Sequence, residues 1–260
     1  MKRTERESWG EKGMRFALNA GSIATGAFSM SEGWGETEMT LRTENGAENN
    51  FKASARLGMR REGEWIVRLE GKALKELVTL AVRGYFHGAF RISKEEIRRL
   101  KDVYGQRDAL CDYGSGKLYL ECDADISEFI RESLILARVE GYARMLGTLP
   151  NNFLHVCQMA DYVKRMAADC GLSCRVLSDE RLKELHCGGI LAVNQGSDAP
   201  AALAILGWRK NDEAPTALVG KGVMFDSGGY HLKKPEKMAE MQRRARVWLE
   251  HADSPAARIK

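Results

Sequence analysis

The sequence lacks the features that mark membrane-spanning and secreted proteins. No apolar run reaches the roughly 18 residues that a membrane helix needs. Residues 1–7 are charged and contain no apolar core of the kind found in signal peptides. The 40 basic and 36 acidic residues leave a formal charge of +4, too small an excess to indicate a nucleic-acid partner. We therefore expect a cytoplasmic protein with no membrane partner, and the charge disfavours nucleic acid.

Several common catalytic and metal-binding motifs are also missing. The chain has no H-E-x-x-H pair, no phosphate loop with a G-x-x-x-x-G-K-[ST] spacing and no G-x-S-x-G elbow. Its histidines show no metal-ligand spacing, so we interpret His155, His186 and His231 as ordinary surface or core residues. Without a signal peptide or a C-x-x-C pair, the cysteines are expected to be reduced thiols: Cys111, Cys122, Cys157, Cys170, Cys174 and Cys187.

What is present is typical of a folded globular protein. Apolar residues make up 44% and charged residues 29% of 260 residues, enough for one large or two ordinary domains. The first part of the chain predicts strands at residues 64–69 and 117–122 and helices over about 72–84 and 93–103. A weaker strand signal lies at residues 38–43.

A long helix predicted over residues 127–146 divides the chain into two parts. It is apolar on two sides, which favours a helix packed between domains. We therefore predict two domains, residues 1–146 and residues 147–260. In the second, helices and apolar runs alternate, which indicates an α/β sheet covered on two sides. The expected helices are 157–170 and 179–186, and the apolar or strand-like runs are 174–177, 189–193, 201–206 and 216–219.

The most informative stretch is residues 218–233, where three polar groups stand in an apolar, glycine-rich frame. Glycines flank Lys221 on both sides, and two more follow closely after Asp226. Glycine lets the backbone approach a bound group closely, and an amine and a carboxylate five residues apart could ligate a metal ion. Without further context, a lysine such as Lys221 is more often a solvated turn residue, and an aspartate such as Asp226 is usually a turn or cap residue.

Three separated stretches resemble the leucyl aminopeptidase family of cytosolic two-metal exopeptidases. Residues 140–152 resemble the entry to its catalytic domain, and residues 188–197 resemble a strand-turn within it. The most specific match is Val-Gly-Lys-Gly-Val-Met-Phe-Asp-Ser-Gly-Gly at residues 219–229. The resemblance implies an N-terminal α/β domain followed by the first part of an α/β/α metallopeptidase sheet domain. It also implies peptide substrates, hydrolysis of N-terminal residues, and a homo-oligomer, which in the family is a hexamer.

The resemblance carries roles over to four residues. Lys221 and Asp226 match metal ligands, and two divalent ions, Mn²⁺ or Zn²⁺, are expected as cofactors. Lys233 matches the lysine that polarises the substrate carbonyl, and Met241 matches a residue of the substrate-binding pocket. A lysine ligates a metal only as the neutral amine, which a neighbouring divalent ion favours.

The sequence departs from the family after residue 241. Where the family has a further metal-binding aspartate, this chain has Arg244, and a guanidinium repels cations. The later acidic ligands of the family have no counterpart. We therefore expect a C-terminally truncated member that lacks several metal ligands and is impaired or inactive alone. The alternative is a non-catalytic remnant that acts as an oligomerisation or binding module.

Overall fold

The structure is a computed structural model that describes residues 14–25, 29–30, 39–208, 216–228 and 230–235. The chain forms two compact units, each described here by itself. The first contains Met1–Ser93 and Asp108–Tyr142, and the second contains Lys94–Arg107 and Ala143–Lys260. The boundary at residues 146 and 147 stays a prediction. Within the described ranges, no helix is both long and apolar enough to cross a membrane.

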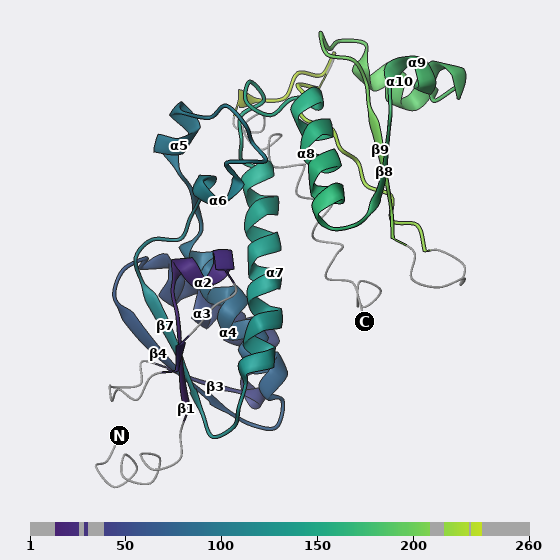
Figure 1. Cartoon of the computed structure of the whole chain (residues 1–260). Coiled ribbons are helices and arrows are strands. Elements are labelled where there is room, and N and C mark those ends of the chain that lie inside the picture. The colour runs from purple at the N-terminus through teal and green to yellow at the C-terminus, as the bar shows by residue number, and fades with distance from the viewer. Residues whose placement is uncertain (1–13, 26–28, 31–38, 209–215, 229, 236–260) are drawn as a thin grey trace, which may run out of the picture. The chain divides into compact units, whose positions relative to one another are not determined.

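The first unit is built on a five-stranded mixed sheet with the order β2-β1-β7-β4-β3 (Figure 1). Strand β3 is parallel to β4 and β4 is parallel to β7, whereas β1 is antiparallel to both β7 and β2. The strands are β1 (Met14–Leu18), β2 (Ser29–Met30), β3 (Met39–Arg42), β4 (Glu64–Glu70) and β7 (Lys117–Cys122). The strands predicted at 64–69 and 117–122 are confirmed, each within one residue of its bounds.

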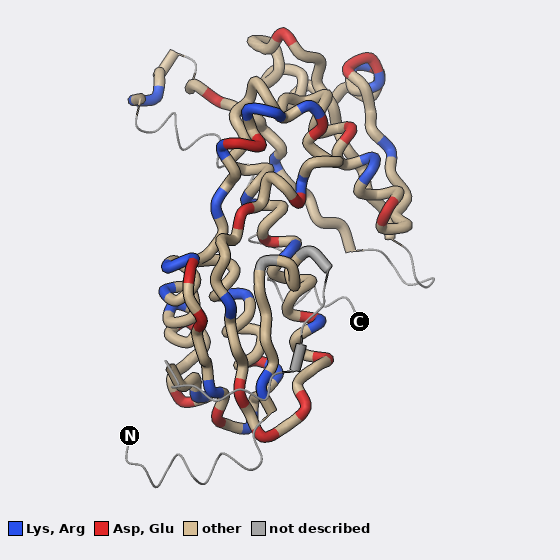
Figure 2. Tube along the Cα trace, turned by 60° about the vertical axis from the view of Figure 1, so that its left-hand side comes forward, with Lys and Arg blue, Asp and Glu red and all other residues tan. Residues whose placement is uncertain are grey.

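The two faces of this sheet differ sharply in chemistry. One face buries apolar side chains to 1% exposure or less: Phe16, Leu18, Leu41, Val67, Leu69, Leu118 and Leu120. The other face carries ion pairs between residues that are direct cross-strand neighbours: Arg15–Glu121–Arg68, Arg42–Glu70 and Lys117–Glu64. Basic and acidic residues are correspondingly interspersed along the described chain, with no long segment of one sign (Figure 2). The period of two along each strand therefore separates core from surface.

Two helices cross over between the parallel strands and pack unusually close together. Helices α3 (Ala47–Met59) and α4 (Leu74–Ala89) connect β3 to β4 and β4 to β7, so both lie on the same side of the sheet (Figure 1). Glycines permit the close approach. A Cβ on Gly88 would lie 1.9 Å from the carbonyl oxygen of Ala55, and one on Gly58 would lie 1.9 Å from that of Tyr85. The backbones therefore touch where the small residues face each other.

Helix α7 (Ser127–Leu146) has the bounds that its sequence predicts. One of its apolar faces is buried, with Ile130, Leu134 and Ala137 at 3% exposure or less. The second apolar face is open, because Ile135 is 53% exposed and Val139 is 47% exposed. The remaining elements assigned wholly or partly to the first unit are short: α2 (Ala20–Thr25), the 3-10 helix Thr43–Asn45, β5 (Arg91–Ile92), α6 (Arg107–Leu110) and β6 (Cys111–Asp112).

The second unit contains α5 (Lys94–Arg98), α8 (Val156–Asp169), β8 (Ser173–Leu177), α9 (Asp179–Glu184), α10 (Gly188–Asn194) and β9 (Leu203–Gly207). Strands β8 and β9 are antiparallel neighbours. The separate segment 94–107 is held to α8 by a hydrogen bond of 2.7 Å from Arg165 to Asp102. The ring of Tyr104 also packs edge-on against Tyr162 at 5.1 Å.

The α/β class is confirmed, but three local predictions in the second unit are wrong. The helix predicted over 93–103 is limited to α5. The apolar run at 189–193 lies in helix α10, since periodicity cannot separate a short buried strand from a helix. Residues 216–219 form no strand, because no described strand pairs with them, and Val219 is 97% exposed. The predicted sheet covered on two sides is, in the described residues, a two-stranded antiparallel ribbon.

Candidate functional site

The predicted site residues follow β9 in a stretch of the second unit that forms neither helix nor strand over residues 216–228 and 230–234. Lys221 and Asp226 lie in segment 216–228, and Lys233 lies in segment 230–235. Met241 and Arg244 fall outside the described residues. The site therefore consists of turns and extended backbone, so its shape depends on local hydrogen bonds.

A tight turn after Asp226 reverses the chain. The N–H of Gly228 donates to Oδ1 of Asp226 at 2.8 Å, and the N–H of Lys233 donates to the carbonyl oxygen of Ser227 at 3.0 Å. Gly228 has a φ of 107°, and a Cβ there would lie 2.4 Å from the carbonyl oxygen of His231. Only glycine fits this position without strain. The turn brings residue 233 back onto residue 226, seven positions earlier.

Asp226 and Lys233 are consequently in direct contact. The Nζ of Lys233 forms an ion pair with Oδ2 of Asp226 and also donates to the backbone carbonyl oxygen of Asp226 at 3.1 Å. The side chain of Asp226 is 36% exposed and that of Lys233 is 20% exposed. The hydrogen bond from Lys233 holds the pKa of Asp226 below its usual value, and the Gly228 N–H acts in the same direction. Asp226 is therefore held as a carboxylate, and Lys233 lies against it.

Lys221 is close to this pair but does not contact it. Its positive charge adds a smaller contribution to the lowered pKa of Asp226, after those of Lys233 and Gly228. Its side chain is exposed, and it forms no hydrogen bond or ion pair with any residue in the described ranges. The structure thus brings Asp226 and Lys233 together and leaves Lys221 beside them. That Asp226 and Lys221 are metal ligands stays a prediction.

The described residues do not fit a two-metal centre. No group of three or more His, Cys, Asp or Glu side chains in the described ranges is placed to hold a metal ion. Divalent ions of this kind take four or more ligands. Here one carboxylate is available, and both of its oxygens already accept hydrogen bonds. No catalytic step of this chain can therefore be derived through a bound metal.

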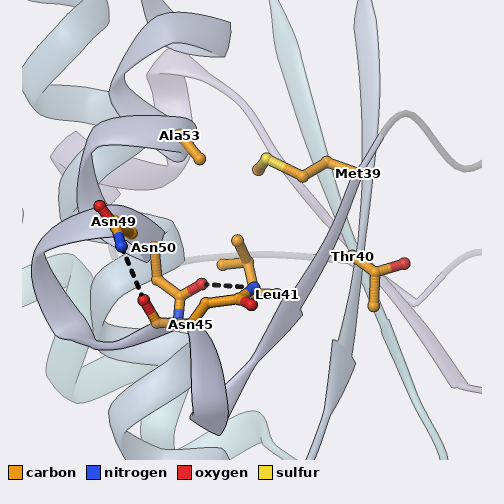
Figure 3. A pocket seen from close by; sticks show the side chains of 7 residues that line it. All are labelled: Met39, Thr40, Leu41, Asn45, Asn49, Asn50 and Ala53. Carbon is orange, nitrogen blue, oxygen red and sulfur yellow. Dashed lines mark hydrogen bonds between the residues drawn. The ribbon is translucent and has the colours of Figure 1, made fainter.

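A hollow of about 290 Å³ in the first unit, between β3 and α3, was not indicated by the sequence (Figure 3). It is lined by Met39, Thr40, Leu41, Asn45, Asn49, Asn50 and Ala53. The side-chain amides that line the hollow bond to nearby backbone. The amide of Asn49 donates to the carbonyl oxygen of Asn45 at 2.9 Å, and the amide of Asn50 donates to the carbonyl oxygen of Arg42 at 2.8 Å. The lining contains no ionisable side chain, so it offers no acid, base or nucleophile.

The cysteines are all free thiols, as predicted. Cys122 is fully buried, and burial raises the pKa of its thiol. A buried thiol with a raised pKa is a poor nucleophile. Thiol catalysis at Cys122 is therefore disfavoured, and the Asp226–Lys233 pair remains the strongest candidate site.

A known protein family resembles the part of the chain that contains the predicted site residues. Residues 141–245 match the family model described as "Cytosol aminopeptidase family, catalytic domain". The matched range includes Lys221, Asp226, Lys233, Met241 and Arg244. The likeness therefore covers the whole predicted site and most of the second unit.

Similar proteins have been described in several bacteria. A "Probable cytosol aminopeptidase" of Syntrophotalea carbinolica is 35% identical over 178 residues, which are 66% of this chain and 34% of the relative. The protein of the same name in Azotobacter vinelandii is 45% identical over 133 residues, which are 48% of this chain and 27% of the relative. The chain spans about a third of the length of these curated relatives.

Solved structures show the same fold. The structure of "Bottromycin maturation enzyme BotP in complex with Mn" aligns with a TM-score of 0.57 at 23% identity. The alignment covers 95% of this chain and 51% of that chain. A second structure of BotP aligns with a TM-score of 0.56 at 24% identity. At this identity the likeness concerns the fold alone, and it covers most of the chain.

Proposed function

We propose that this chain, whose residues 141–245 belong to the cytosol aminopeptidase family, is a leucyl-aminopeptidase-like hydrolase that removes N-terminal residues from peptides. One observation carries the proposal. The family match includes Asp226 and Lys233, and the turn at Gly228 brings these two side chains into contact. The names of the relatives also support the cytoplasm as the compartment in which the protein acts.

Lys233 is the residue that can act on a substrate carbonyl. A lysine ammonium has three N–H donors, and two of those on Lys233 bond to Asp226, to its carboxylate and to its backbone oxygen. The third donor can face a substrate. When water attacks a peptide carbonyl, negative charge develops on the oxygen, and a positioned ammonium stabilises that charge. Asp226 holds the ammonium in place, so its role is positioning.

The same geometry predicts that the chain alone is an impaired peptidase. Electrostatic stabilisation of an oxyanion is strong only where water is excluded. Here Asp226 is 36% exposed, and Lys221 faces solvent. The family resemblance implies Mn²⁺ or Zn²⁺ as cofactors, but the described residues supply one carboxylate and one amine. We therefore propose slow turnover by this chain.

The proposal is tested by assaying leucine-amide hydrolysis with added Mn²⁺ or Zn²⁺. Wild type should hydrolyse the amide slowly, and Lys233→Ala should abolish turnover because it removes the cation that faces the oxyanion. Lys234→Ala removes the adjacent, exposed lysine and serves as the matched control, with activity retained. If wild type and Lys233→Ala have the same rate, or neither has any, the peptidase proposal fails.

A second function, a non-catalytic oligomerisation or binding module, is favoured by exposed apolar side chains around the site. Val219 is 97% exposed, Leu232 is 72% exposed and Trp208 is 55% exposed. Exposed apolar patches often mark interfaces. A homo-oligomer, a hexamer in the resembled family, would cover such groups. Analytical ultracentrifugation decides this point, since a monomer at all concentrations would remove the support for this alternative.

A further inference from the structure

We propose that Lys233 is the resident counter-ion of Asp226 and competes with divalent cations for this carboxylate, so that the chain binds such cations weakly. The inference rests on the proposed function, because it concerns the same pair of residues. In the proposed function Lys233 faces the substrate carbonyl. The counter-ion role is a second one, in which the ammonium of Lys233 takes the place of a metal ion at Asp226. The poor fit of the described residues to a metal centre is its starting point.

Both oxygens of the Asp226 carboxylate are already engaged. Oδ1 accepts the N–H of Gly228 at 2.8 Å, and Oδ2 accepts the ammonium of Lys233. The ammonium is further fixed by its bond of 3.1 Å to the backbone oxygen of Asp226. An arriving cation must therefore displace Lys233 or share an oxygen with it. Either event breaks a charge-assisted hydrogen bond.

The pair is also better protected from solvent than the ion pair between Arg181 and Glu184 in the same unit. Lys233 and Asp226 are 20% and 36% exposed, whereas Arg181 and Glu184 are 55% and 61% exposed. Less exposed pairs are less screened by water and salt. The turn that forms the pair is itself closed by the backbone hydrogen bond between residues 233 and 227. The backbone on both sides of the pair is therefore fixed by that bond as well.

The local charge opposes a cation as well. Lys221 and Lys233 contribute two positive charges against the single negative charge of Asp226, which leaves a net charge of +1 before any metal arrives. Lys221 is close enough for its charge to act on Asp226. Within the described ranges, Asp226 belongs to no group of three or more His, Cys, Asp or Glu side chains that could hold a metal ion. A divalent cation is thus repelled at the one carboxylate that could hold it.

The test is a calorimetric titration of Mn²⁺ into wild type, Lys233→Met and Lys234→Met, each checked for folding by circular dichroism. Removing one positive charge beside a divalent ion should tighten Mn²⁺ binding by at least about tenfold in Lys233→Met. Lys234→Met makes the same change in net charge one residue away, and its affinity should equal that of wild type. Adding Asp226→Asn to Lys233→Met should remove the gained binding.

Equal affinities in wild type and Lys233→Met, including no detectable binding in either, would overturn the inference. An equal gain in Lys234→Met would also overturn it, because the effect would then be one of net charge alone. Binding and turnover are separate readouts. Failure of leucine-amide hydrolysis together with the expected binding pattern would overturn the proposed function and leave the counter-ion role standing.

Discussion

At the scale of single residues, Glu121 shows how the open face of the first sheet is stabilised. Its carboxylate lies between Arg15 and Arg68 at 2.9 and 2.8 Å, and the residue is 8% exposed. Burial alone would raise the pKa of Glu121, but the hydrogen bonds from the two arginines outweigh burial and hold the pKa below its ordinary 4.5. Ionised Glu121 therefore stabilises the folded state.

The lowered pKa of Glu121 gives a prediction with a definite sign. Its contribution to stability is complete above the unfolded pKa of about 4.5 and is lost as the pH falls through the lower folded pKa. Glu121→Gln should therefore reduce the free energy of unfolding at pH 7 by about 3 kcal/mol, as breaking a buried pair does. The deficit should shrink as the pH falls below 4.5. Urea unfolding of both proteins at pH 7 and below 4.5 measures this difference.

Glu64 provides the control for this prediction. It pairs with Lys117 across the same two strands, β4 and β7, but both side chains are about half exposed. Solvent screens such a pair, so Glu64→Gln should change stability little. Equal losses in Glu121→Gln and Glu64→Gln would mean that burial does not set the strength of these pairs.

At the scale of secondary-structure elements, the contact between α3 and α4 depends on glycine. A Cβ on Gly88 would lie 1.9 Å from the carbonyl oxygen of Ala55, so Gly88→Ala must force the helices apart. We expect a loss of about 3 kcal/mol in the free energy of unfolding, at the upper end for overpacked cores. Thermal and urea unfolding measure it.

Gly189→Ala is the matched control, because Gly189 also lies in a helix, α10, and no atom would lie within 4 Å of the new Cβ. Alanine has the higher helix propensity, so this change should be neutral or stabilise by up to about 1 kcal/mol. A stable Gly88→Ala variant would show that the two helices can separate without cost.

The elements also show what could be predicted from the sequence. The sequence predicts strands β4 and β7 and helix α7 within a residue of their bounds. Helix α3 was missed. Its buried face includes Asn50, Ser54 and Gly58, which carry no apolar signal. Its stability comes from packing against α4, which is a tertiary effect.

The sequence indicates which residues form the candidate site, but it predicts only part of their arrangement in space. The glycines around Lys221 and Asp226 indicated a close-packed backbone, and Gly228 does adopt a positive φ. The contact between Asp226 and Lys233 was not predicted, because it arises from a turn whose hydrogen bonds the sequence does not specify. The position of Lys221 beside this pair, rather than in contact with it, likewise depends on the folded chain.

At the scale of the whole molecule, the family match and the exposed site have to be considered together. The chain spans about a third of the length of its curated relatives, and the described part of its second unit exposes apolar side chains near the site. A site open to water stabilises charge weakly. The proposed function accommodates both facts as a peptidase of low activity, in which Lys233 is shared between Asp226 and the substrate.

The most direct test of this account is mass spectrometry of a leucine-initiated peptide and its N-acetylated twin, each incubated with the chain and Mn²⁺. An aminopeptidase acts only at a free amino terminus. We predict loss of the single N-terminal residue from the free peptide and no change in the acetylated one. Cleavage at internal bonds, equal cleavage of both peptides, or no cleavage of either would contradict the account.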